Sequence, residues 1–261
     1  GQTTAAERAL VAACRAGEEC ILGDGKRPTA PSDESTVGAD LLRYLIVGGC
    51  DGCVLHESGV DLDGAYITGA LDLRMVKAVG VTGLSFCHFA EGIDAMNTHF
   101  ELLALSGSVL PSLNAQGAEV TGSVFLSDGF TAKGEVSFSG AQIGGQLNCT
   151  GGTFKIEKEK EKALNAQGAV VRGDVVLRNG FTAKGAVSFS GAQIGGQLEC
   201  CGGTFENAGG NALNAQGAEV KSSVFLSNGF TAKGEVSFSG AQIGGQLECD
   251  DGTFENAKGD A

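Results

Sequence analysis

Four residues near the N-terminus have the types and spacing of metal ligands. Cys50 and Cys53 form a Cys-x-x-Cys pair, His56 follows three residues later, and Cys20 precedes them. Thiolate sulfur and imidazole nitrogen are ligands of tetrahedral zinc, so the spacing predicts a structural zinc ion held by these four residues. A Cys50–Cys53 redox pair and thiols without a role are the two alternatives, because a single Cys-x-x-Cys does not distinguish them.

Three carboxylates form a second candidate group. Asp61, Asp63 and Asp72 fall in segments that we expect to be neighbouring strands, where paired carboxylates would serve hydrolysis or hold a cation. The alternative is that they are solvated outward positions of amphipathic strands. The Walker A, G-x-G-x-x-G, H-E-x-x-H and G-x-S-x-G patterns do not occur. We therefore expect no catalytic residue and no bound cofactor apart from the zinc.

A long repeat supplies the elements that position these residues. The segment 113–154 returns with small changes at 164–205 and at 213–254, so the copies start 51 and 49 residues apart. Gly-Ala pairs divide each copy into two shorter units of about 23 residues. A period of this length is typical of one coil of a solenoid.

Within a coil, apolar residues alternate with polar ones, and glycines interrupt the alternation. Val136 and Phe138, Ala141 and Ile143, and Leu147 and Cys149 form three such pairs. We therefore predict that residues 54–261 form a right-handed parallel β-helix, an all-β, three-sided solenoid of roughly 8 or 9 coils. The alternative is a four-sided pentapeptide-repeat helix, for which we find no five-residue apolar period.

Both ends of the repeat region carry information. Residues 1–53 predict an N-terminal helical cap, with a capping box at Thr4 to Glu7 and a second helix at 36–47. Two helices would cover the open edge of the first coil. At the other end, residues 254–261 match 205–212, where a further repeat begins. This match predicts additional coils or end-to-end self-association through an uncapped C-terminal coil.

The repeat text resembles a known family. GVDLDGAYITGALDL, SGSVLPSLNAQGAEVTGSVFL and GAQIGGQLNCTGGTF, with GEECILGDGKRP and LLRYLIVGGC in the leader, are similar to bacterial repeat proteins labelled "membrane-associated oxidoreductase". The similarity extends over nearly the whole chain. It implies a β-helical, pentapeptide-repeat-like solenoid, and it implies no catalytic residue that can be placed on this sequence.

Other cysteines repeat with the coils. Cys149, Cys200 and Cys249 take the same inward position in the three copies, two coils apart, which is too far for a disulfide. We expect them to be buried free thiols, with Cys14 packed inward and Cys201 facing outward. An odd total of nine cysteines and buried thiols favour a reducing compartment, so we expect a cytoplasmic protein.

Composition limits the partners. The 261 residues include 43 glycines and carry a net charge of −13, and no apolar run is long enough for a membrane span. Strong negative charge disfavours direct binding to nucleic acid. We expect a non-enzymatic scaffold that presents flat faces to a protein partner. The alternatives are an acidic DNA mimic that inhibits a nucleic-acid-binding protein, and an enzyme or glycan binder on a β-helix.

Rows of equal residues are the expected interaction surface. Outward positions of a solenoid form lines along its axis when the repeats are nearly identical. The rows are Gln142, Gln193 and Gln242; Gln146, Gln197 and Gln246; Ser137, Ser188 and Ser237; and Lys133, Lys184 and Lys233. The alternative is that duplication copied these residues and they only keep the surface hydrated.

Overall fold

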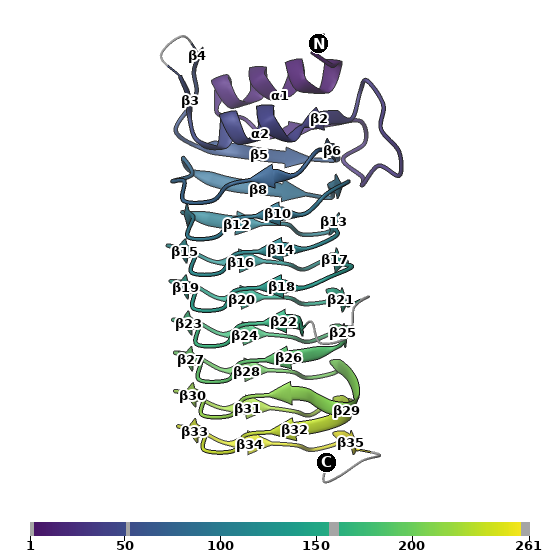
Figure 1. Ribbon diagram of the computed structural model, residues 1–261, viewed down its shortest axis with the longest axis vertical. Coiled ribbons are helices and arrows are strands. Elements are labelled where there is room, and N and C mark those ends of the chain that lie inside the picture. Colours follow the sequence, from purple (N-terminus) through teal and green to yellow (C-terminus); the bar gives the residue numbers. More distant parts are fainter. Residues whose placement is uncertain (1–2, 51–52, 157–161, 257–261) are drawn as a thin grey trace.

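The protein is a column of stacked β-coils with two helices at its N-terminal end (Figure 1). The computed structural model describes residues 3–50, 53–156 and 162–256. The column has about eight turns, and its coils pair through parallel strands from the first ladder to the last. The predicted β-solenoid with an N-terminal helical cap is confirmed.

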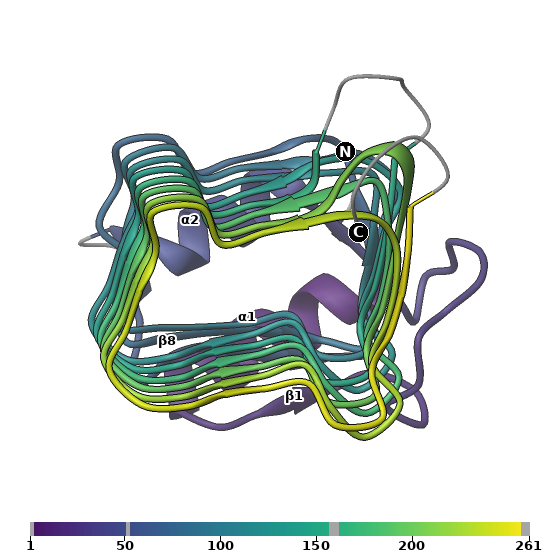
Figure 2. The same ribbon diagram turned by 90° about the horizontal axis from the view of Figure 1, so that it is seen from below.

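Each coil has four sides rather than the three that we predicted (Figure 2). Face 1 consists of β1 (Cys20–Ile21), β5 (Gly59–Asp63), β8 (Val81–Ser85), β12 (Leu102–Ala104), β16 (Val124–Phe125), β20 (Leu147–Asn148), β24 (Val175–Val176), β28 (Leu198–Glu199), β31 (Val224–Phe225) and β34 (Leu247–Glu248). Face 2 consists of β2 (Thr36–Gly38), β6 (Tyr66–Thr68), β9 (His88–Phe89), β13 (Val109–Leu110), β17 (Thr131–Ala132), β21 (Thr153–Lys155), β25 (Thr182–Lys184), the first parts of β29 (Thr204–Asn214) and β32 (Thr231–Ser237), and β35 (Thr253–Glu255).

The remaining strands complete the coil. Face 3 consists of β7 (Leu71–Asp72), β10 (Ile93–Asp94), β14 (Leu113–Asn114), β18 (Val136–Ser137), β22 (Lys162–Asn165), β26 (Ala186–Ser188) and the last parts of β29 and β32. Face 4 consists of β11 (His99–Phe100), β15 (Glu119–Val120), β19 (Gln142–Ile143), β23 (Val170–Val171), β27 (Gln193–Ile194), β30 (Glu219–Val220) and β33 (Gln242–Ile243). A separate hairpin joins β3 (Gly49–Cys50) to β4 (Cys53–Val54). In Figure 2 the chain runs counter-clockwise from face 1 to face 4 as it approaches the viewer, so the solenoid is right-handed.

Face 2 is the side of the coil that we did not predict from the sequence. From β17 onward its strands read Thr-x-Lys or Thr-x-Glu, and in alternate coils the inward residue is a small alanine such as Ala132 or Ala183. The alanines leave room for phenylalanine rings that enter from the position before the threonine. Rings from both positions form one column inside the solenoid, with neighbouring centroids 5.1–5.3 Å apart, made of Phe130, Phe154, Phe181, Phe205, Phe230 and, partly buried at its end, Phe254. Because this interior stack is continuous, large apolar residues are not needed at every face 2 position.

The N-terminal cap forms as predicted, with a shorter second helix. Helix α1 (Ala5–Ala16) begins at Thr4, whose hydroxyl accepts from the Glu7 amide while the Glu7 carboxylate accepts from the Thr4 amide. Helix α2 (Ala39–Ile46) begins three residues later than expected because 36–38 pair with β6 as strand β2. Both helices bury their apolar sides on the first coil, so its interior is covered (Figure 1). The ladders therefore start inside the segment 1–53.

The last described coil lacks a comparable cover in the part of the chain that the structure describes. Leu247, on an inward position, is 50 % exposed, although its counterparts Leu147 and Leu198 are fully buried. Cys249 is exposed for the same reason, so our prediction of burial is wrong for this residue. Cys149 and Cys200 are buried free thiols and Cys14 is buried, as expected.

Candidate functional site

The predicted zinc ligands do not form a described cluster. Cys20 lies on β1 with its side chain buried, and desolvation raises the pKa of its thiol, which opposes thiolate formation. The His56 ring is exposed and its Nδ1 lies 3.1 Å from the Ser58 hydroxyl. Cys50 and Cys53 are Cα partners across the β3–β4 hairpin, but their side chains lie outside the described structure. The zinc site and the redox pair therefore remain predictions.

Two of the three predicted carboxylates meet, together with a residue that we did not expect. Asp61 and Asp63 point outward from β5, and the parallel pairing of β1 with β5 brings Glu19 beside them. Carboxylate oxygens of these three residues lie within 4.8 Å of one another. The cluster is an arrangement of oxygen ligands that suits a hard cation. Sequence spacing did not reveal Glu19 because it is placed by a long-range pairing.

Asp63 makes stability depend on pH. Burial, the nearby Glu19 carboxylate and the Asp61 carboxylate together raise the pKa of Asp63 to about 6. The folded state therefore holds this proton more tightly than the unfolded state, and folding stability falls as the pH rises from about 4 to about 6. Asp63→Asn removes the buried charge, so we expect its urea midpoint to exceed that of the parent protein at pH 8 and to match it at pH 4. Equal differences at both pH values would contradict the assignment.

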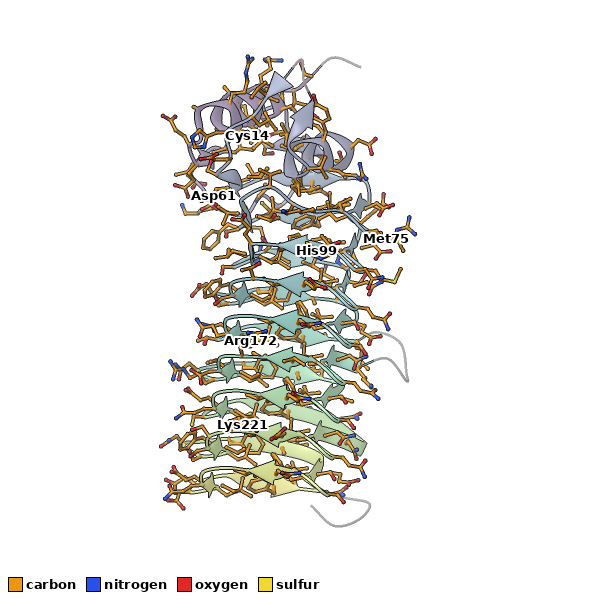
Figure 3. All side chains as sticks on the ribbon, turned by 90° about the vertical axis from the view of Figure 1, so that its left-hand side faces the viewer. Cys14, Asp61, Met75, His99, Arg172 and Lys221 are labelled. Carbon is orange, nitrogen blue, oxygen red and sulfur yellow. The ribbon has the colours of Figure 1, made fainter. Side chains whose placement is uncertain are left out.

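The third predicted carboxylate lies elsewhere. Asp72 is on β7 in face 3, whereas Asp61 and Asp63 are on face 1. Figure 3 shows Asp61 on one edge of the column and Met75, just beyond Asp72 in sequence, on the opposite edge. Asp72 pairs with Arg74 at 2.6 Å, and the hydrogen bond from this guanidinium holds the pKa of the carboxyl well below its usual range. The proposed three-carboxylate site is therefore wrong.

Three of the four predicted rows each occupy one face, whereas Gln146, Gln197 and Gln246 lie between the strands of faces 4 and 1. Glutamines at 142, 193 and 242 project from face 4, and serines at 137, 188 and 237 lie on face 3. Ser188 is only 2 % exposed, so our expectation of an outward row is wrong for this residue. Lysines at 133, 184 and 233 lie in or directly after the strands of face 2. Beside these lysines stands a column that we missed, in register over six successive coils: Thr131, Thr153, Thr182, Thr204, Thr231 and Thr253. The recurring Thr-x-Lys or Thr-x-Glu text was the signal for it.

Face 3 also carries a groove that sequence analysis missed. Two adjoining hollows of about 410 and 320 Å³ share Ser112 and Asn114. Their axis follows one outward residue per coil, aligned by strand register: Asp72, Asp94, Asn114, Ser137 and Asn165. We call this strip, with Ser112 and Glu135 beside it, the face 3 groove. The sequence pattern that could have indicated the groove is the repeated pair Leu-Asn or Val-Ser, in which the second, polar residue faces outward.

Hydrogen bonds fix the groove's planar side chains. Asn114 donates from Nδ2 to Asp94 Oδ1 at 3.0 Å, and Asn165 donates from Nδ2 to Glu135 Oε1 at 3.1 Å. Lys162, at the end of the first insertion, donates to Asn165 Oδ1 at 3.2 Å. The Asn114–Asp94 and Asn165–Glu135 bonds link neighbouring coils, so the groove is preorganised.

Face 4 has a separate hollow of about 340 Å³. Its lining includes Gly144, Thr121 and Arg172. Figure 3 shows His99, Arg172 and Lys221 spaced along this face. His99 lies 3.0 Å from Glu119, and Lys221 pairs with Glu219, so much of the charge on this face is locally paired.

Comparison with known proteins gives no relative. No protein-family model, no curated protein and no solved structure matches this chain. Neither helix in the described part of the chain is both long enough and apolar enough to cross a membrane. Functional inference therefore depends on the geometry of the four faces.

Proposed function

We propose that the protein is a non-enzymatic scaffold that presents the flat side of its column to a protein partner. The observation that supports this proposal is that equivalent side chains on face 2 are aligned from coil to coil by the strand register. Its six threonines stand in one column, and the column beside it consists of Lys133, Lys155, Lys184, Glu206, Lys233 and Glu255. Strand pairing fixes the axial spacing at about 4.8 Å, so a partner would meet the same contact at each coil.

The charges on face 2 favour a protein over a polyanion. Glu206 lies between two lysines, 3.8 Å from Lys184 Nζ and 3.1 Å from Lys233 Nζ. This pairing orders the long side chains and leaves a surface of mixed charge. Such a surface fits a partner with complementary mixed charges, and charge complementarity gives specificity more than affinity.

An acidic DNA mimic fits the described faces less well. A mimic needs unbroken columns of carboxylates to imitate the phosphates. On face 3 the column begins with Asp72 and Asp94 but continues with Asn114 and Ser137. On face 2 the described acidic residues alternate with lysines. These interruptions support the scaffold proposal.

Site-specific photo-crosslinking in cells that produce the protein tests the scaffold. A photoreactive residue replaces Thr182 on face 2 or, as a matched control, Gln193 on face 4. We expect one dominant protein adduct from position 182, and we expect Lys184→Glu to abolish it. The proposal fails if both positions give the same adducts, or if position 182 gives none.

A further inference from the structure

The face 3 groove has the dimensions of a linear ligand. It follows one outward residue on each of five successive strands, β7, β10, β14, β18 and β22, along the axis of the column. At about 4.8 Å per coil, the strip is about 19 Å long. A chain of several monosaccharide units would lie along it, whereas a compact ligand would occupy only one of its two hollows.

The groove lining is rich in hydrogen-bonding groups whose capacity is not exhausted. Only one oxygen of Glu135 and one Nδ2 hydrogen of Asn165 are needed for the bond that joins them. Ser112 Oγ makes no hydrogen bond within the described residues, although it lies in both hollows. Planar carboxylates and carboxamides match the paired hydroxyls of a sugar ring, because adjacent hydroxyls both donate and accept. The bonds between coils hold these groups in place before a ligand arrives, which lowers the cost of binding.

Local charge disfavours an anionic ligand. The Asp72 carboxylate is paired with Arg74, which also lies 3.6 Å from Asp94 Oδ2. Glu135 carries negative charge close to Asn165, and Lys162 lies at the same end. The strip therefore has no cationic surplus for a phosphate or uronate.

We propose that the face 3 groove binds an uncharged, linear oligosaccharide through its fixed amide, carboxylate and hydroxyl groups. This site is separate from the protein-binding surface on face 2. It would let the scaffold hold a glycan on one side of the column and a protein on another. Either proposal can fail without the other.

Calorimetric titration of the full chain tests this proposal. The probes are hexasaccharides of β-1,4-glucan, β-1,4-xylan, α-1,4-glucan and β-1,4-N-acetylglucosamine, with the hexamer of galacturonic acid as the charged comparison. We expect at least one neutral hexamer to bind with a Kd below about 1 mM. The proposal is overturned if none of the four does, or if the galacturonate hexamer binds as tightly as the best neutral one.

Two substitutions in identical sequence contexts locate the binding. Ser137→Arg fills the groove, whereas Ser237→Arg changes the same position of the later repeat, within the same Gly-Glu-Val-Ser-Phe-Ser-Gly text. We expect the first to weaken binding about tenfold or more and the second to leave the affinity within about twofold. Asn114→Ala, which removes the contact with Asp94, should also weaken binding, and thermal melting confirms that each variant folds. Equal weakening by both arginine variants would overturn the assignment.

Discussion

Phe181→Ala is expected to lower the free energy of unfolding by about 3–5 kcal/mol. The Phe181 ring is fully buried and lies between Phe154, 5.3 Å away, and Phe205, 5.1 Å away. Removing it leaves a cavity in the middle of the column and interrupts the stack. Urea denaturation followed by circular dichroism measures the loss.

Phe254→Ala is the matched control for this substitution. Phe254 occupies the last place in the same stack, contacts only one ring among the described residues, and is only partly buried. Its replacement leaves an open notch rather than an enclosed cavity, so we expect a loss of about 1 kcal/mol. Comparable losses for both variants would show that stacking inside the column contributes little to stability.

Gly144→Ala is expected to destabilise the protein by at least about 3 kcal/mol, because the new methyl group has no room. A Cβ at this glycine would lie 2.1 Å from the Thr121 carbonyl oxygen of the preceding coil. That oxygen belongs to the backbone, so two coils would have to separate. A strongly reduced melting temperature and urea midpoint would report the effect.

Gly140→Ala is a control that distinguishes destabilisation by lack of space from destabilisation by backbone strain. Gly140 has a φ of +66°, which a side chain disfavours, but no atom lies within 4 Å of the Cβ position. We expect a cost of about 1 to 2 kcal/mol from the left-handed conformation alone. If Gly140→Ala proved the more damaging change, close approach of the coils would not be the reason for the glycine at 144.

The sequence was sufficient to predict the overall architecture because the same local pattern occurs in every copy of the repeat. The period, the alternation and the glycines predicted the stacked coils, and the Thr4 to Glu7 capping box predicted the start of α1. The number of sides was not predictable by the same means. Ala132 is a small residue on an inward position, and its space is filled by Phe130 from outside the strand.

The composition of the candidate sites depends on pairing between residues that are far apart in the sequence. Glu19 joins Asp61 and Asp63 only because β1 pairs with β5, a register that no local pattern encodes. Asp72 is only nine residues beyond Asp63, yet the coil has turned two corners between them and the two carboxylates occupy different faces. The face 3 groove depends in the same way on how successive coils align.

The alternation of phenylalanine and alanine on face 2 has a consequence for how such a gene can change length. Each copy of the long repeat contributes one ring from before the threonine and one from after it. Deleting or duplicating a whole copy would recreate junctions that the column already contains. Recombination between the near-identical copies would therefore add or remove two turns at a time and give columns that still fold. Adding or removing a single turn would instead bring together two turns that place their phenylalanine at the same position, a junction that the column does not contain.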